Sequence, residues 1–521
     1  MGVDILYGLG LAAYLGLMIF VGYLVKDRIK TSDDYLVAGR SFGLFFNSGT
    51  LSACFIGGGI LIGCSGQLFS VGIWDDAYLS GGAIILIGGF MLCLILAGTF
   101  YMPKLWRMKF LSLGDLFYTR FGRRIGMLSS ILITINFLIW VAVQILVFGK
   151  IVNVMLGWDL HLAIVIAMTV ICSYTILGGL FAVCFTDIIQ LSITLLGVGI
   201  LVVYAVGAVG GWEQFTASYN PDFVKLVPAE GGFDPWLAWF GAFAAVGLGG
   251  IVSPDLMQRA FSAKSPGIAR NSAYIACTVL FGFGVMLTII CLSGHILVDN
   301  GVITDPHLLG DPAAGIEGDP ELILPVMSKV ILPLPLVVLF LGACLSAVMS
   351  AAATALLALA GMTSINIYRD IFNPTASHET LVKVSRILVL CMGFLATILA
   401  IYYPSAGELS AFAFDLLLAS ILSAMTLAIF WKKANSIGAG AGMVAGMLFR
   451  VVGAAIDSGE FSLQAMAYPE HWYYFTLLSP VVSLVTIVVV SLATQKKCKP
   501  IEMLPPIENA ADDKELEREA V

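Results

Sequence analysis

The chain has 521 residues, of which 59% are hydrophobic and only 12% are charged, and its formal net charge is −7. Soluble domains carry about 25% charged residues, so this composition excludes a soluble protein and indicates an all-α integral membrane protein. Apolar runs long enough to cross a bilayer recur along the whole chain, and no segment has the composition of a separate soluble catalytic domain.

About thirteen apolar segments predict membrane-spanning helices. In chain order they cover residues 4–25, 45–71, 79–103, 125–156, 159–180, 183–208, 236–262, 269–297, 333–367, 380–403, 408–431, 434–456 and 472–494. The division between the fifth and sixth segments rests on Gly178 and Gly179, because the apolar run is otherwise continuous. Residues 1–498 are therefore expected to form one transmembrane domain, followed by a short charged tail at 499–521.

Basic residues gather in alternate loops, which indicates the orientation of the chain. They are Lys26, Arg28, Lys30, Arg40, Lys104, Arg107, Lys109, Arg120, Arg123, Arg124, Arg259, Lys264, Arg270, Arg369, Lys383, Arg386, Lys432, Lys433, Lys496, Lys497 and Lys499. The positive-inside rule places these loops in the cytoplasm. We therefore expect a multi-pass protein of the cell (plasma or inner) membrane with its N-terminus outside and its C-terminus in the cytoplasm.

Two spans are interrupted by residues that disfavour a continuous helix. The second span contains Gly57, Gly58 and Gly59, and each glycine costs about 0.5–1 kcal/mol relative to alanine within a helix. The seventh span contains Gly249, Gly250 and Pro254. Broken helices are tolerated in a membrane where they line a cavity, although glycines also serve simple close packing between helices.

The two breaks lie five spans apart, and an odd separation inverts the second half of the chain relative to the first. Repeats over about 45–208 and 236–431 would place both breaks in corresponding positions. Such a pair of interrupted helices is typical of a secondary transporter with its binding site near the membrane midplane.

Four motifs carry a resemblance to a known family. They read SDDYLVAGRS at 32–41, GGLFAVCFTDIIQ at 178–190, DLMQRAFSAKS at 255–265 and SAVMSAAATALLALAGMTSINIYR at 346–369. In this order they resemble the sodium/solute symporter family, and AGRSFGL, FIGGGILIG, DLHLAIVI and AGMLFRVVGA look most like its high-affinity choline transporter branch. The resemblance implies a LeuT-type fold of five plus five inverted helices, with one extra N-terminal helix and two extra C-terminal helices. It also implies sodium-coupled symport of a small organic solute by alternating access.

Mapped onto this chain, the family's sodium site uses the carbonyls of Ala53, Ile56 and Ala347 and the hydroxyl of Ser350. The family usually has a second Ser or Thr where this chain has Ala351, so one hydroxyl ligand is lost. A carrier that is coupled to protons, or that does not depend on sodium, therefore remains an alternative to a sodium-coupled one.

The resemblance also implies an aromatic cage for a cationic or quaternary ammonium solute, which rings bind through cation–π attraction. Phe55 and Trp140 match positions of this cage, whereas Ser253 and Ser410 stand where aromatic residues are expected. Ordinary helix packing is the alternative role for both rings. The residues predicted to bind the solute are Phe55, Gly57, Gly58, Gly59, Trp140 and Ser253.

Four charged residues inside or beside the spans are candidates for coupling or gating, because intramembrane charge is costly. Asp187 matches the family's Thr-Asp pair and is predicted to be a waypoint for a cation, a titrating group or a helix cap. Asp255 and Arg259 lie one turn apart and are predicted to pair at a cytoplasmic gate. Asp415 could meet a cationic solute or pair with a base such as Arg450.

Other classes of protein are less consistent with the sequence. It contains no HExxH or GxSxG motif, so we do not expect an enzyme. A channel or a membrane sensor remains an alternative, although too few residues follow the last span for a signalling module. The expected partners are the solute, sodium and the lipid bilayer, without nucleic acid, and the sequence does not indicate an oligomeric state.

Overall fold

The computed structural model describes residues 37–501 apart from 75–82, 229–231, 313–315, 404, 461, 463–465 and 467–468, together with the isolated positions 16 and 20. The predicted span at 4–25, the N-terminal orientation and the tail beyond residue 501 lie outside the described residues. Within the described part, ten helices are long and apolar enough to cross a membrane, or eleven if one bent pair counts as a span.

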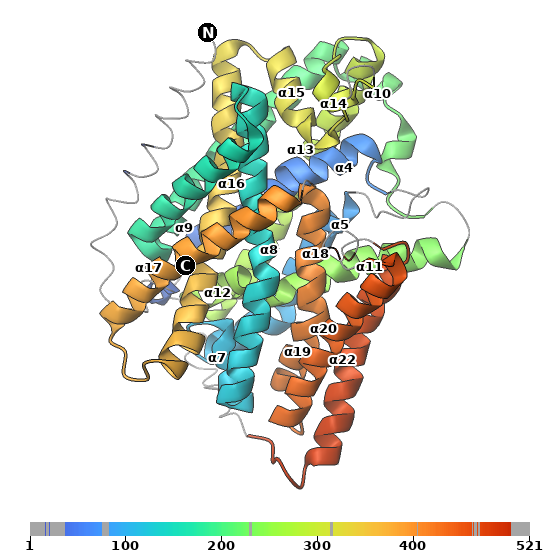
Figure 1. Ribbon diagram of the computed structural model, residues 1–521. Coiled ribbons are helices and arrows are strands. Elements are labelled where there is room, and N and C mark those ends of the chain that lie inside the picture. The colour runs from blue at the N-terminus through green and yellow to red at the C-terminus, as the bar shows by residue number, and fades with distance from the viewer. Residues whose placement is uncertain are drawn as a thin grey trace.

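The described segments between residues 37 and 501 are almost entirely helical (Figure 1). The helices are α3 (Leu44–Phe55), α4 (Ser65–Ser70), α5 (Ile84–Leu96), α6 (Met102–Arg107), α7 (Leu113–Phe121), α8 (Arg123–Leu156), α9 (Leu160–Val209), α10 (Trp212–Ser218), α11 (Phe233–Gly249), α12 (Pro254–Ser262), α13 (Pro266–Asp299), α14 (Pro306–Leu309), α15 (Ile323–Ile331), α16 (Leu334–Thr363), α17 (His378–Tyr402), α18 (Ala406–Leu417), α19 (Ser423–Phe430), α20 (Ser436–Ser458) and α22 (Trp472–Thr494). Short 3-10 or π segments are η2 (Ala38–Arg40), η3 (Gly59–Cys64), η4 (Ala97–Tyr101), η5 (Pro221–Val224), η6 (Gly250–Val252), η7 (Pro320–Leu322), η8 (Ser364–Arg369) and η9 (Leu418–Leu422).

Three spans form the centre of the bundle. The most apolar stretches of α8, of α16 with η8, and of α18–η9–α19 are 72%, 78% and 78% buried, compared with 28% for α22. Helices α20 and α22 pack against each other at one side of the bundle. A site enclosed by buried helices is therefore expected among α8, α16 and α18, and not at the pair α20 and α22.

The helix α9 is kinked where the sequence predicts a boundary between two spans. Gly179 has φ 52° and ψ −160°, a left-handed conformation that glycine adopts without the steric penalty of a side chain. The part before the kink contains only a shorter apolar helix, Leu160–Ser173. The predicted break at this position is therefore present as a kink, whereas the count of thirteen spans is not confirmed.

Both predicted interruptions are present. The segments Leu44–Phe55 and Gly59–Ser70 are bent by 55° relative to each other. In the seventh predicted span, α11 ends at Gly249 and α12 begins at Pro254, with Ser253 extended at φ −68° and ψ 133° between them. A Cβ atom on Gly249 would lie 2.0 Å from the carbonyl oxygen of Phe414, so this break also lets α18 approach closely.

Candidate functional site

The first break turns two backbone amides away from the helix. The amide of Gly57 donates to the carbonyl of Phe55 at 2.9 Å instead of the carbonyl of Ala53, its partner in a continuous helix. The amide of Gly58 donates to Oε1 of Gln144, on α8, at 2.7 Å. The carbonyls of Ala53 and Cys54 thereby lose their helical donors and become available to a ligand.

The three glycines also allow three helices to converge on the break. A Cβ atom would lie 2.6 Å from Cβ of Ala351 at Gly57, 2.8 Å from Cβ of Val147 at Gly58, and 2.5 Å from Oγ of Ser410 at Gly59. These contacts come from α16, α8 and α18, respectively. The break therefore combines the two interpretations of the sequence, since it is both an unwound segment and a site of close helix packing.

Gln144 is a residue that the sequence alone did not single out, and its role can be tested. Substitution Gln144→Leu leaves the buried amide of Gly58 without an acceptor, which should lower the free energy of unfolding by about 1–3 kcal/mol. Denaturation of the purified protein measures this loss. The exposed Gln214 on α10 provides the control, and an equal effect of Gln214→Leu would contradict the role of Gln144.

A cluster of four aromatic rings lies beside the first break. Ring centroids are 4.9 Å apart for Phe55 and Phe90, 5.0 Å for Phe90 and Phe414, and 5.1 Å for Trp140 and Phe414. All four side chains are at most 2% exposed, and the indole of Trp140 also lies next to Gly59. The predicted Phe55 and Trp140 thus lie in one cluster, and Phe90 and Phe414 complete what we call the aromatic cluster.

Of the two serines that replace expected aromatic residues, Ser410 lies against the first break and Ser253 lies in the second. Ser410 contacts Gly59 and donates its hydroxyl to the carbonyl of Ala406 at 2.6 Å. Phe414 follows Ser410 by one helical turn, so a ring is supplied from the same face of α18. Ser253 is fully buried in the second break, where Gly250 packs against α5 close to Phe90.

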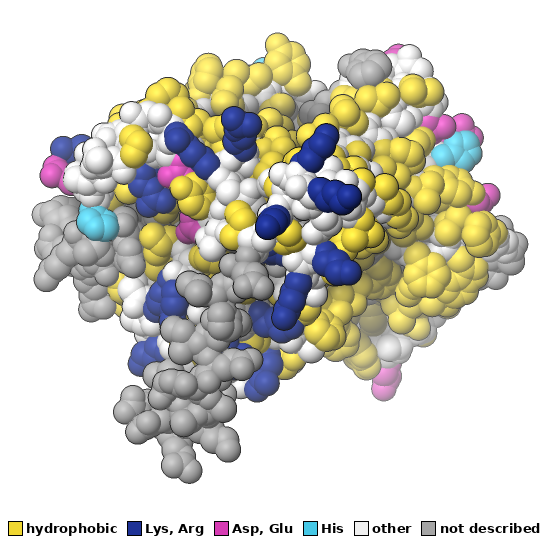
Figure 2. Space-filling model, turned by 90° about the horizontal axis from the view of Figure 1, so that it is seen from below, with side chains coloured by type: hydrophobic (Ala, Val, Ile, Leu, Met, Phe, Trp, Pro, Cys, Tyr) yellow, Lys and Arg dark blue, Asp and Glu magenta, His cyan; other side chains and the backbone are white. Residues whose placement is uncertain are grey.

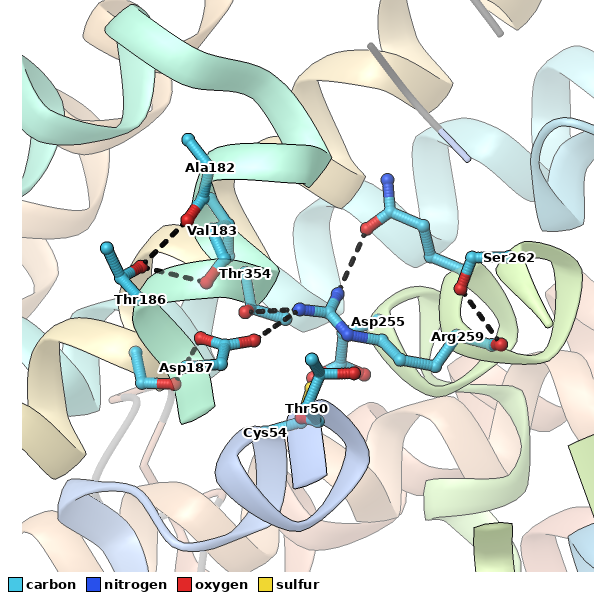
Figure 3. Close-up of polar contacts among 12 residues, drawn as sticks. Thr50, Cys54, Ala182, Val183, Thr186, Asp187, Asp255, Arg259, Ser262 and Thr354 are labelled. Carbon is cyan, nitrogen blue, oxygen red and sulfur yellow. Dashed lines mark hydrogen bonds and ion pairs between the residues drawn. The ribbon is translucent and has the colours of Figure 1, made fainter. Parts of the chain in front are cut away.

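A second group of polar residues connects α9, α12 and α16. The guanidinium of Arg259 donates to Oδ2 of Asp187 at 3.0 Å and to the hydroxyl of Thr354 at 2.8 Å. The hydroxyl of Ser350 donates to Oδ1 of Asp187 at 2.5 Å. Figure 3 shows the guanidinium of Arg259 pointing toward both Asp187 and Thr354, beside the turn of α3 that carries Thr50 and Cys54.

This arrangement corrects the predicted ion pair at the second break. Arg259 pairs with Asp187, which lies 72 residues away, whereas the carboxylate of Asp255 accepts the amide of Leu256 at 2.7 Å. Asp187 and Arg259 are both fully buried. Because Ser350 is a predicted sodium ligand, the structure brings a carboxylate directly to that residue.

Asp415 lies in another buried ion pair. Its Oδ2 accepts from Nε of Arg450 at 2.5 Å and from the hydroxyl of Thr476 at 2.9 Å, and Arg450 also donates to the carbonyl of Met466 at 2.9 Å. These partners lie on α20, on α22 and in the segment between them. Of the two alternatives for Asp415, the structure contains the pair with a base.

Comparisons with known proteins give a family match and several similar proteins. Residues 35–446 match the model of the sodium:solute symporter family. The chain is 29% identical to human high affinity choline transporter 1 over 451 residues, which cover 84% of this chain and 75% of that protein. The choline transporter of Caenorhabditis elegans is 26% identical over 497 residues, covering 92% and 82%.

The most informative solved structure is a Na+-coupled sialic acid symporter in a substrate-bound, outward-open state. It superimposes with a TM-score of 0.78 at 18% identity and covers 94% of this chain and 98% of its own. The nucleobase-cation-symport-1 family transporter Mhp1 has a TM-score of 0.56 at 14% identity, with coverage of 92% and 98%. Both likenesses support the predicted LeuT-type fold.

Proposed function

Because the chain belongs to the sodium:solute symporter family, we propose that it carries a small quaternary ammonium solute of the choline class together with sodium, by alternating access. The chain is a multi-pass membrane transporter and not an enzyme. The observation that carries the proposed solute is the aromatic cluster against the first break. The high affinity choline transporters among its relatives favour the same class.

The charges around the cluster support a solute held by rings rather than by an anion. Asp415, next in the chain to Phe414, is paired with Arg450, and Asp187 is paired with Arg259. A quaternary ammonium suits such a site, because cation–π attraction requires no carboxylate partner. Besides the aromatic cluster, the backbone at 57–59 and Ser253 are proposed to contact the solute.

The sodium site is proposed at the carbonyls of Ala53, Ile56 and Ala347 and the hydroxyl of Ser350. Support comes from the amide of Gly57, which leaves the carbonyl of Ala53 without its helical donor. Further support comes from the carboxylate of Asp187, 2.5 Å from the Ser350 hydroxyl, since its oxygen compensates for the hydroxyl that Ala351 lacks. Carbonyl, hydroxyl and carboxylate oxygens suit a hard cation.

Arg259 is proposed to act beside the ion rather than on the solute. Its guanidinium neutralises Asp187 and so competes with a cation for the same carboxylate. Asp255 lies in the first turn of α12 at the second break, where its carboxylate accepts the amide of Leu256 and fixes the start of that helix. In this arrangement Asp255 stabilises the start of α12, and Arg259 controls the charge of the Asp187 carboxylate.

The orientation is proposed from the distribution of basic residues. Figure 2 shows Lys and Arg side chains gathered on the face seen from below, the face toward which α7 and the end of α22 point in Figure 1. Basic residues mark the cytoplasmic side of membrane proteins. We therefore assign this face to the cytoplasm of a cell membrane, and the C-terminal tail with it.

The test is the thermal stability of the purified protein in sodium or potassium, with and without choline, at two pH values. A ligand at 100 times its dissociation constant stabilises the folded state by about 2.7 kcal/mol, which shifts the melting temperature measurably. We expect a sodium-specific shift that choline enlarges and that Ser350→Ala removes. A choline shift that depends on pH but not on sodium would instead favour proton coupling, and no choline shift in any condition would reject the proposed solute.

A further inference from the structure

The span that carries Phe414 is held at both ends by charged side chains from other elements. This span consists of α18, η9 and α19 and runs from Ala406 to Phe430. In Figure 1 it stands beside α8, with α18 in the upper half and α19 in the lower half. The charge at each end is the one that the helix dipole favours, since the N-terminus attracts anions and the C-terminus attracts cations.

Glu321 of η7 caps the outer end. Its Oε1 accepts the amide of Ala406 at 2.8 Å and the amide of Gly407 at 2.9 Å, two of the first amides of α18, which have no partner within the helix. Its Oε2 accepts Nζ of Lys150 at 2.5 Å, and Lys150 also binds Asp319 at 2.8 Å. The side chain of Glu321, which is only 10% exposed, thus joins α18 to α8.

The side chain of Glu321 also packs against the outer half of the first broken helix, where a Cβ atom on Gly66 would lie 2.7 Å from its Cγ. A Cβ atom on Gly66 would lie 2.9 Å from Cα of Glu321, and one on Gly63 would lie 2.6 Å from Cα of Gly407. Gly63, Gly407 and Glu321 line a cavity of about 710 Å³, and one turn deeper Gly59 lies against Ser410. The contacts of Gly63 with Gly407 and of Gly59 with Ser410 therefore lie between this cavity and the aromatic cluster. Glu321 holds Gly407 in the first of these contacts.

Arg120 of α7 caps the inner end. Its guanidinium donates to the carbonyls of Ala428 at 3.3 Å, Trp431 at 3.2 Å and Lys432 at 3.0 Å, where α19 ends. Burial lowers the pKa of Arg120, but the ordinary value for arginine is so high that the side chain stays charged. Cationic side chains commonly bind the last carbonyls of a helix in this way.

Helix α7 is itself fixed to the span that carries Ser350. The side-chain Nδ2 of Asn366, in η8 at the end of α16, donates to Oδ1 of Asp115 at 2.8 Å. The hydroxyl of Ser112 donates to Oδ1 of Asn366 at 2.7 Å. Arg120 is therefore anchored on a helix that contacts the end of α16. The inner cap links the span of the aromatic cluster to the span of the proposed sodium site.

From these contacts we infer that Glu321 and Arg120 are the two latches of the span Ala406–Phe430. Release of Glu321 from the amides of Ala406 and Gly407 frees the outer end of the span and connects the cavity with the aromatic cluster. Release of Arg120 from the carbonyls at the end of α19 frees the inner end of the span. With both latches closed, as in this structure, the span is fixed at each end. Lys150 is a positioning residue, because it holds the Glu321 carboxylate on the helix amides.

The outer latch is tested by the rate at which a membrane-impermeant thiol reagent, added from outside, modifies the variant Ser410→Cys. Glu321→Gln keeps the shape of the side chain but removes the charge that binds Lys150 and favours the helix N-terminus, and we expect modification to accelerate about tenfold. The control Glu317→Gln removes an exposed carboxylate from the same cavity and should have no effect. Proteins with native Ser410 give the background from the other cysteines.

The inner latch is tested in the same assay, where its release should have the opposite sign. Arg120→Gln should slow modification from outside at least threefold, and the exposed Arg124→Gln should not. A second outer variant, Lys150→Met, should accelerate modification even if Glu321→Gln folds poorly. Rates that equal those of the matched controls would overturn the inference, and so would a change of the same sign for Glu321→Gln and Arg120→Gln.

This assay needs no solute and no sodium gradient. Its outcome therefore does not depend on whether choline or sodium is the true ligand. A failure of the proposed function in the thermal shift experiment leaves the latch experiment interpretable, and the reverse also holds.

Discussion

Replacement of Arg259 by methionine is expected to lower the free energy of unfolding by about 3–5 kcal/mol and to abolish coupled uptake. The substitution leaves the carboxylate of Asp187 fully buried without its charge partner, which is the costly way to break a buried ion pair. It also removes a donor to Thr354. Denaturation of the purified protein measures stability, and uptake into vesicles measures transport.

Two comparisons make this result specific to the ion pair. Arg270→Met changes an exposed arginine at the start of α13 and should have little effect on either measurement. The double variant Arg259→Met with Asp187→Asn should recover part of the lost stability, because the uncompensated charge is then gone. Additive losses in the double variant would mean that the two residues do not interact.

The breaks were predictable from the sequence because their cause is local. Gly57–Gly59 and Gly249-Gly250 with Pro254 disfavour a helix by their own backbone properties, wherever the chain folds. The kink at Gly179 follows from the same reasoning and has the left-handed φ that only glycine adopts readily. The family resemblance added the LeuT-type arrangement of the spans, which composition alone does not supply.

The partners of Gly58 and of the aromatic rings were not predictable, because they depend on how distant helices pack. Gln144 lies 86 residues from Gly58, and nothing in its local sequence distinguishes it from a glutamine that packs without a partner. Phe90 and Phe414 lie in apolar runs that also contain other aromatic residues, such as Phe100 and Phe412. For Phe414 a weak signal existed, namely its place one turn after Ser410, where an aromatic residue was expected.

The incorrect pairing of Asp255 with Arg259 has a physical explanation. Spacing of four residues on one helix favours an ion pair, and this spacing was the only geometry available from the sequence. Asp255, however, lies in the first turn of α12, where unpaired amides attract its carboxylate, and it accepts the amide of Leu256. Arg259 is then directed to Asp187 on α9, a partner that only the packing of α9 against α12 and α16 creates.

Replacement of Phe414 by leucine is expected to weaken choline binding about thirtyfold while costing less than about 1.5 kcal/mol of stability. Leucine keeps an apolar side chain of similar volume but removes the ring face, and a desolvated cation–π contact is worth about 2 kcal/mol. Phe412→Leu is a matched control, since Phe412 lies on the same helix and is equally buried but faces the guanidinium of Arg450, 5.2 Å away. Titration of choline against the melting temperature gives both affinities.

The substitution in the opposite direction separates a cation site from simple packing. Trp attracts a cation more strongly than Phe does, so Phe414→Trp should tighten choline binding if the larger ring is accommodated beside Trp140. If the ring only fills space, Phe414→Trp should instead lower the stability of the protein, because overpacking destabilises a close-packed core. Equal weakening by Phe414→Leu and Phe412→Leu would place the solute elsewhere, since the two rings differ mainly in the direction they face from α18.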